Sequence, residues 1–382
     1  MRGETAFLAF VDQIAIPARQ SALLALEEYF QQHKESLAAA FISDFKSLCR
    51  SLSERQATGE IGKIGYITHS ILRSEWLTGG FIYLTEVMNK DWFLDRNVWQ
   101  TFYSTPWVLP FLNGYLNELD RARKSFDARI TIAELDAWSL KEITHFHTYV
   151  IALLRFAFVH FNSTDWPELQ ALEKEDIFEI RIGEYLDVSE SVYKKNNKPY
   201  SENEFRMRLE ESEEDAVYCY EDYGYLQLRE MELEGLDFRN SSFEGCDFSN
   251  SRLNRCILLG TQWRNSILQG VDLTFSAIQG ANFSFASMNE ACLIGVNGSE
   301  GLLDQSEWKM PGFTAVNFTG ASLRGTDFSR AKLKGAIFRE ADLTGANFTF
   351  ADLTDADFTG ANLTNTVFTI TQQHVLRQEV RK

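Results

Sequence analysis

Hydrophobic residues recur at every fifth position over the last third of the chain. Residues 331–362 read AKLKG AIFRE ADLTG ANFTF ADLTD ADFTG AN, in which a small residue is followed two places later by Leu or Phe. Helices repeat about every 3.6 residues and strands every 2, so neither element produces a period of five. A fixed period of this kind predicts a repeat architecture, in which successive units share one structure.

The period extends well beyond this passage. Traced backwards, the large position continues through Phe313, Trp308 and Leu303 to Leu228, and Gly298 is the one position without a large side chain. We therefore expect each unit to point one small and one large residue inward, and to leave its other three residues in water.

The pattern resembles the A(D/N)Lxx motif of the pentapeptide-repeat family over residues 226 to about 370. The resemblance implies a right-handed, quadrilateral β-helix with about 20 residues per coil and about seven coils. Residues 20 positions apart would then stack in columns, such as Phe328, Phe348 and Phe368. Residues 297–312 keep the phase but lose the consensus. Either a loop that leaves the coil and returns or a locally deformed coil would explain this segment.

The first half of the chain has a helical pattern instead. Over residues 18–55, apolar residues recur at spacings of three and four, which predicts one long amphipathic helix or two abutting ones. Two capping boxes, Thr131-x-x-Glu134 and Ser139-x-x-Glu142, predict further helix starts. The apolar run 146–161 contains Arg155 and is too short to cross a bilayer, so it is expected to be a central buried helix.

One part of this half favours strands. Residues 66–71 and 81–87 are rich in β-branched and aromatic residues, and the turn-forming residues 78–80 lie between them. The expected fold is therefore a mainly helical N-terminal domain with a β-hairpin, followed by the β-helix.

A polar, proline-bearing segment at residues 194–199 predicts a linker. Nine carboxylates follow within residues 202–222, and this stretch is expected to cover the open end of the first coil. The predicted domains are 1–193, mainly α-helical; 194–225, linker and acidic N-terminal cap; 226–370, β-helix; and 371–382, C-terminal cap. The resemblance implies a homodimer contact through the C-terminal end.

The sequence contains no catalytic, metal or cofactor motif, so we expect a protein that is not an enzyme and holds no cofactor. His145 and His147 would point about 200° apart on a helix, so they are interpreted as surface or core residues rather than metal ligands. Five scattered cysteines, and acidic residues near the N-terminus without a cleavage site, predict a cytoplasmic protein. No membrane contact is expected.

Charge leaves two hypotheses for function. The chain carries a net charge of −17, and the pentapeptide-repeat family includes topoisomerase-binding members whose acidic rods mimic DNA and give resistance to gyrase-targeting drugs or toxins. From residue 226 onward, however, 18 acidic residues face 14 basic ones, far below the charge density of a duplex. The candidate acids for this mimicry are Asp327, Asp342, Asp352 and Asp357.

The favoured hypothesis is a non-catalytic scaffold, an adaptor or chaperone that binds a protein or peptide and presents it to a partner enzyme, without direct nucleic-acid binding. Its candidate partner-binding residues form a basic belt on the β-helix: Arg324, Arg330, Lys332, Lys334 and Arg339. A second candidate is an aromatic surface in the N-terminal half, since tryptophan is common at binding hot spots. Its members are Trp76, Trp92, Trp99 and Trp107.

Overall fold

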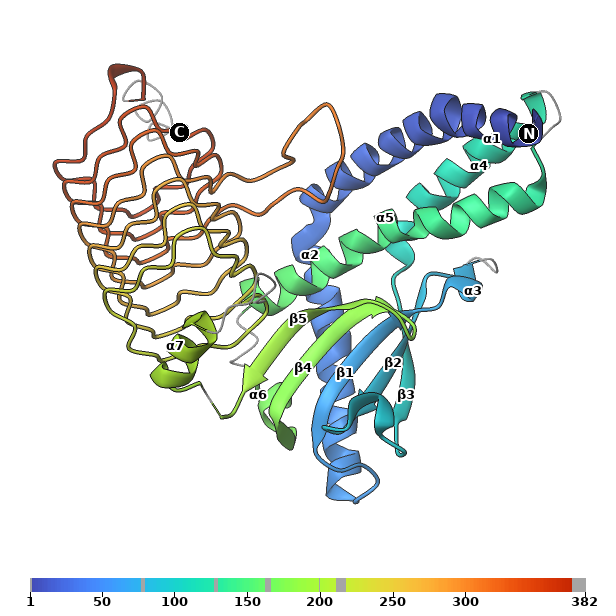
Figure 1. Ribbon diagram of the computed structural model, residues 1–382, viewed down its shortest axis with the longest axis horizontal. Coiled ribbons are helices and arrows are strands. Elements are labelled where there is room, and N and C mark those ends of the chain that lie inside the picture. The colour runs from blue at the N-terminus through green and yellow to red at the C-terminus, as the bar shows by residue number, and fades with distance from the viewer. Residues whose placement is uncertain are drawn as a thin grey trace. The chain divides into compact units, whose positions relative to one another are not determined.

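The computed structural model describes residues 2–76, 80–126, 130–161, 166–198, 200–210 and 218–372. The chain forms two compact units. The N-terminal unit contains residues Met1–Asn197 and the segment Leu302–Gly312, and the C-terminal unit contains Lys198–Gly301 and Phe313–Lys382. Both are visible in Figure 1, where the C-terminal unit runs from yellow to red.

The N-terminal unit is mixed α/β, so the expectation of a mainly helical domain is wrong. Its helices are α1 (Arg2–Phe10), a π-helical turn at Val11–Ala15, α2 (Ile16–Ala57), α3 (Arg73–Trp76), α4 (Leu109–Ser125), α5 (Ile132–His160) and α6 (Pro167–Gln170). Its strands are β1 (Ile64–Ile71), β2 (Ile82–Met88), β3 (Trp99–Ser104), β4 (Lys174–Glu184) and β5 (Ser189–Asn196). They form one sheet in the order β3-β2-β1-β4-β5.

The predicted hairpin is confirmed, because β1 and β2 pair antiparallel with Ile67 opposite Val87. Strand β4 joins the other edge of β1 in parallel, and β5 continues the sheet antiparallel to β4. Because β5 reaches Asn196, the residues Lys194 and Lys195 belong to the sheet and not to a linker.

Helix α5 begins with the predicted capping box. The Thr131 side chain accepts from Glu134 N, and the Glu134 side chain accepts from Thr131 N. The second predicted box is wrong. Ser139 lies inside α5, and its hydroxyl donates to Leu135 O of the preceding turn at 2.7 Å. Residues 146–161 are the centre of the core, as expected, where Phe158 packs edge-on against Phe45 of α2.

The segment Leu302–Gly312 leaves the β-helix and packs within the N-terminal unit. Trp308 is buried there, and its Nε1 donates to the Tyr149 hydroxyl of α5 at 2.7 Å. The Gln20 side chain of α2 bonds the Trp308 backbone in both directions. The five-residue phase predicts Trp308 and Leu303 to be inward residues of a coil, and this prediction is wrong. Both belong to a loop, in which Leu303 is exposed.

The C-terminal unit is a four-sided β-helix. Four short parallel bridges per coil join residues 20 apart, such as Asp222 with Ser242 and Asn317 with Ile337. Predicted columns of aromatic side chains are confirmed: Phe328, Phe348 and Phe368 stack with ring centroids 4.8 and 5.4 Å apart. Small residues such as Ala341 and Ala346 are also buried, as expected for the second inward position.

The 20-residue spacing fails at the loop. There Asn282 pairs with Asn317, and Phe283 stacks on Phe318 at 5.2 Å, 35 positions later. The inserted length is a multiple of five, which is why the phase persists through residues that are not in the coil. Gly298 remains in the coil, and a Cβ there would lie 2.6 Å from Val316 Cγ1. Val316 therefore occupies the space that a large residue would fill.

The first coil is covered by helix α7 (Glu202–Glu210), whose buried Phe205 packs edge-on against Tyr223 at 5.0 Å. Part of the acidic run, residues 211–217 with four of its nine carboxylates, lies outside the described residues. At the other end, Gln372 donates to the carbonyls of Phe348 and Ala351. The predicted C-terminal cap continues into residues 373–382, which are also outside the described part.

Candidate functional site

The five basic residues of the predicted belt lie on three different sides of the β-helix. The bridge residues Ser322, Lys332 and Ile337 belong to three different columns, one on each side. Arg324 lies on the side of Ser322, and Arg339 lies on the side of Ile337. Arg330, Lys332 and Lys334 lie together around the side of Lys332. We call this group of three the cationic strip.

Arg324 and Arg339 are already paired with acids of the next coil. Arg324 Nη1 lies 3.1 Å from Asp342 Oδ2, and Arg339 Nε contacts Asp357. Both pairs join residues 18 apart, a spacing that recurs between Arg229 and Asp247. These arginines therefore link successive coils, and their charges are locally neutralised.

The cationic strip is different. Within the described residues, Arg330, Lys332 and Lys334 form no ion pair, although Asp352 is the bridge partner of Lys332 on the next coil. Arg330 and Lys332 are exposed, and Lys334 is half-buried. Phe350, 73% exposed, occupies the corner of Arg330 one coil later. The three positive charges of the cationic strip therefore lie beside one exposed aromatic ring.

The four acids proposed for DNA mimicry do not form a row. The bridges place Asp327, Asp342, Asp352 and Asp357 on four separate sides of the β-helix. Each carboxylate also accepts bonds from the backbone or hydroxyl two residues later, as Asp342 does from Thr344. That hydrogen bond, with Arg324 nearby, lowers the pKa of Asp342. A duplex presents about one charge per 1.7 Å, whereas strand layers lie about 4.8 Å apart.

The tryptophans of the predicted aromatic surface are also dispersed. Trp92 stacks on Tyr66 at 4.7 Å, with the Arg181 guanidinium 5.1 Å from its ring. Trp107 packs beside Phe30 in the core. Trp76 ends α3, and its side chain lies outside the described part.

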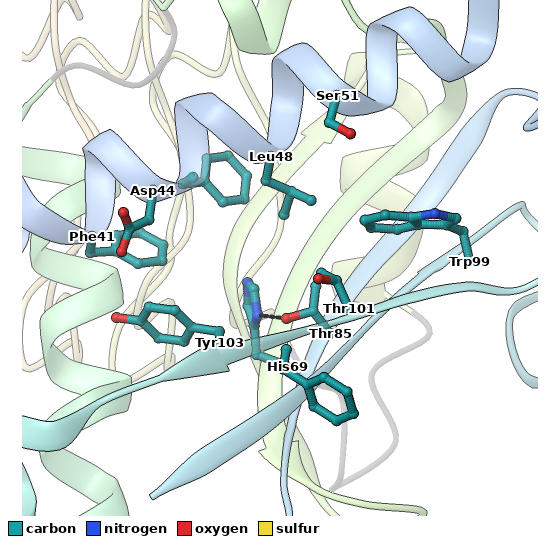
Figure 2. Close-up of a pocket in the computed structure, with 11 residues that line it drawn as sticks. Phe41, Asp44, Leu48, Ser51, His69, Thr85, Trp99, Thr101 and Tyr103 are labelled. Carbon is teal, nitrogen blue, oxygen red and sulfur yellow. Dashed lines mark hydrogen bonds between the residues drawn. The ribbon is translucent and has the colours of Figure 1, made fainter. Parts of the chain in front are cut away.

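Trp99 lines a pocket on the opposite face of the sheet from Trp92, together with His69 of β1 (Figure 2). Residues 66 and 69 of one strand point to opposite faces, which separates the two tryptophans. Sequence reasoning misses this pocket, because its lining comes from one helix and three strands. The one available signal is a histidine, His69, within a segment whose composition predicts a strand.

No group of His, Cys, Asp and Glu that could hold a metal ion occurs among the described residues. His147 is buried, its Nδ1 lies 2.7 Å from the Tyr83 hydroxyl, and burial lowers its pKa to about 4. Burial also lowers the pKa of His145, whose Nε2 lies 3.3 Å from Arg19. No helix in the described ranges is long and apolar enough to cross a membrane.

Solved structures similar to this chain share its repeat region at low identity. HetL, a pentapeptide repeat protein involved in heterocyst differentiation regulation from the cyanobacterium Nostoc sp. strain PCC 7120, is 18% identical, with 44% of this chain and 98% of HetL covered and a TM-score of 0.20. Full-length QnrB1, a plasmid-mediated fluoroquinolone resistance protein, is 17% identical, with 42% of this chain and 99% of QnrB1 covered and a TM-score of 0.17. At such TM-scores neither likeness carries an argument about function.

A third structure, the pentapeptide repeat protein Rfr23 from the cyanobacterium Cyanothece 51142, is 17% identical over 38% of this chain and 90% of its own, with a TM-score of 0.14. The chain matches no curated protein. The family model for pentapeptide repeats matches in 8 copies, at residues 227–262, 264–297, 313–349 and 338–369. The C-terminal region, residues 227–369, therefore belongs to the pentapeptide-repeat family.

Proposed function

We propose that this protein is a non-catalytic scaffold that binds an acidic segment of a protein or peptide along the cationic strip. The observation that carries the proposal is the contrast in pairing: Arg324 and Arg339 are held by acids of the next coil, whereas Arg330, Lys332 and Lys334 are free of ion pairs within the described residues. Charges that are complementary across an interface increase its specificity and its association rate.

The aromatic ring of Phe350 supports a protein partner rather than a simple polyanion. Aromatic residues and arginine are enriched at the centres of protein interfaces, and both are present at this corner of the β-helix. Presentation of the bound segment to a partner enzyme is part of the same proposal. The DNA-mimic alternative gains no support from the acids, which are dispersed and partly neutralised.

The test compares three full-length proteins immobilised as bait in lysate of the source cells. The charge reversal Lys332→Glu with Lys334→Glu should lower recovery of specific partners at least about tenfold, as measured by quantitative mass spectrometry, because acidic segments are then repelled. The matched control reverses Arg252 and Arg255, which are exposed on an earlier coil and, among the described residues, pair with the surface acids Glu232 and Glu234. Such exposed pairs contribute little, so the control should keep its partners.

Equal recovery by the strip variant and the wild type would contradict the proposal, as would equal loss in the control. The DNA-mimic alternative has its own assay. DNA supercoiling by purified gyrase is measured with and without the protein and a quinolone, and we expect neither inhibition nor protection at micromolar concentration.

A further inference from the structure

A cavity of about 310 Å³ lies between α2 and the edge of the sheet formed by β1, β2 and β3 (Figure 2). Its volume is at the lower end of the range of small-molecule sites. The lining residues are Phe41, Asp44, Phe45, Leu48 and Ser51 of α2, His69, Thr85, and Trp99, Thr101, Phe102 and Tyr103 of β3. Since β3 is an edge strand and Asp44 of the lining is exposed, the cavity adjoins solvent.

His69 has a hydrogen-bonding atom without a partner at this cavity. Its ring is 2% exposed, its Nδ1 lies 2.8 Å from Thr85 Oγ1, and its Nε2 forms no hydrogen bond. In Figure 2 the ring rises from β1 towards α2, with Nε2 turned away from Thr85. A buried unpaired polar atom typically costs about 1–3 kcal/mol, so such an atom requires an explanation.

The hydrogen bond with Thr85 determines which ring nitrogen of His69 carries the proton. Thr85 is 1% exposed, and its hydroxyl has no described hydrogen-bond partner other than His69 Nδ1. The buried hydroxyl is satisfied as a donor only if it donates to Nδ1, which must then be an acceptor. Burial lowers the pKa of His69 to about 4, so the neutral ring carries its single proton on Nε2. This N–H therefore needs an acceptor.

The walls restrict the shape and charge of that acceptor. Aromatic rings of Phe41, Phe45, Trp99 and Tyr103 line the cavity, and rings of this kind pack best on flat, apolar molecules. Asp44 is the one carboxylate in the lining. Burial raises the pKa of the Tyr103 phenol, and the negative charge of Asp44 raises it further. A negative ligand would be repelled by Asp44 and would find no Lys or Arg in the lining.

We propose that this cavity binds a small, uncharged aromatic molecule whose oxygen accepts a hydrogen bond from His69 Nε2. The occupant fills the space between α2 and β3, stacks on the aromatic walls and completes the hydrogen bonding of the histidine. The site is separate from the cationic strip, so either proposal can fail alone.

The test uses three probes with one ring system: 2-naphthamide, 2-naphthoate and 2-methylnaphthalene. Equilibrium dialysis against the full chain measures their affinities. The amide should bind several-fold more tightly than the naphthoate, which Asp44 repels. In His69→Phe the amide should lose about tenfold in affinity, as expected for one buried hydrogen bond, while the hydrocarbon changes less than about twofold.

Two further variants separate loss of the site from loss of the fold. Thr101→Trp should fill the cavity and weaken all three probes, and Asp44→Asn should raise the affinity of the naphthoate towards that of the amide. The control His33→Gln changes a histidine of α2 that bonds its own helix and does not line the cavity. Failure of all probes to bind the folded wild type would overturn the proposal, as would an unchanged amide affinity in His69→Phe.

Discussion

Trp308 donates a hydrogen bond to the Tyr149 hydroxyl at 2.7 Å, although the two residues are 159 positions apart. Tyr149 in turn donates to Glu27 Oε2 at 2.7 Å, and the same carboxylate oxygen accepts from Gly312 N at 2.9 Å. Trp308, through Tyr149, and Gly312 at the end of the loop segment thus both connect to one buried carboxylate of α2. Burial, together with the charge of Glu27, raises the pKa of Tyr149, so its phenol stays protonated and can donate.

Replacement of Trp308 should release this loop from the N-terminal unit. We expect Trp308→Phe to cost about 1–2 kcal/mol through the lost hydrogen bond, and Trp308→Ala to cost about 3–5 kcal/mol through the cavity as well. The measurement is limited trypsin cleavage after Lys309, which should become faster in that order. Met310→Ala changes a 44% exposed side chain in the same loop and should leave the cleavage rate unchanged. Similar rates in Trp308→Ala and the wild type would contradict the anchoring.

Stacked phenylalanines should stabilise the β-helix mainly in the interior. Phe338 lies between Phe318 and Phe358, with centroids 5.1 and 5.0 Å away. Phe338→Ala should therefore cost about 3–5 kcal/mol, and hydrogen exchange should accelerate in the neighbouring coils. Phe350→Ala removes a ring of the same size from the surface and should stay within about 0.5 kcal/mol of the wild type. Equal effects of the two changes would argue against the ladder.

Corner glycines accept side chains from the preceding coil. A Cβ on Gly295 would lie 2.5 Å from the Phe275 ring, and its φ of 63° is unfavourable for other residues. Gly295→Ala should cost about 2–4 kcal/mol from the contact and the backbone together. Gly345→Ala, with a φ of 72° and nothing near its Cβ, should cost only about 1–2 kcal/mol. The free energies of unfolding are measured in urea. Adding Phe275→Ala to Gly295→Ala should reduce the cost of the glycine change to that of Gly345→Ala. If the costs of Gly295→Ala and Phe275→Ala simply add in the double variant, the proposed contact is contradicted.

Acid should destabilise the N-terminal unit through its two buried histidines, His69 and His147. Burial lowers the pKa values of His69 and His147 to about 4, below the ordinary 6.5. Between pH 4 and 6.5 the unfolded chain therefore binds more protons than the folded chain. The contribution of these two histidines to the free energy of unfolding is complete above about pH 6.5 and is lost as the pH falls towards 4. The loss is on the order of 2 kcal/mol per histidine. Hydrogen exchange of β1 from pH 7 to 4.5 should show it, and His69→Phe should flatten the profile.

The sequence predicts the repeat region well because every coil buries the same pair of positions, as Ala341 and Leu343 do. It fails at Trp308, because a loop whose insertion is a multiple of five preserves the phase. It also misses β4, where Phe178, Ile180 and Ile182 face the core between charged neighbours. The pairing of β4 with β1 joins residues more than 100 positions apart, and no local pattern encodes it.

The candidate site is predictable only in part, for a related reason. The sequence supplies five basic residues close together in the chain, but pairing in the fold distinguishes Arg324 from Lys332. An ion pair between coils depends on which residue lies 18 positions away, as Asp342 does for Arg324. The His69 pocket depends on α2 and three strands at once, so local composition does not reveal it.

The most direct test of the proposed scaffold function places a photoreactive benzoylphenylalanine on the β-helix of the full chain in the source cells. At position 350 the probe replaces an exposed ring beside the cationic strip, and at position 285 it replaces a 51% exposed ring at a different corner. We expect a discrete protein adduct from position 350 that Lys332→Glu with Lys334→Glu abolishes, and no such adduct from position 285. No adduct from position 350, or the same adduct from both positions, would contradict binding at the strip.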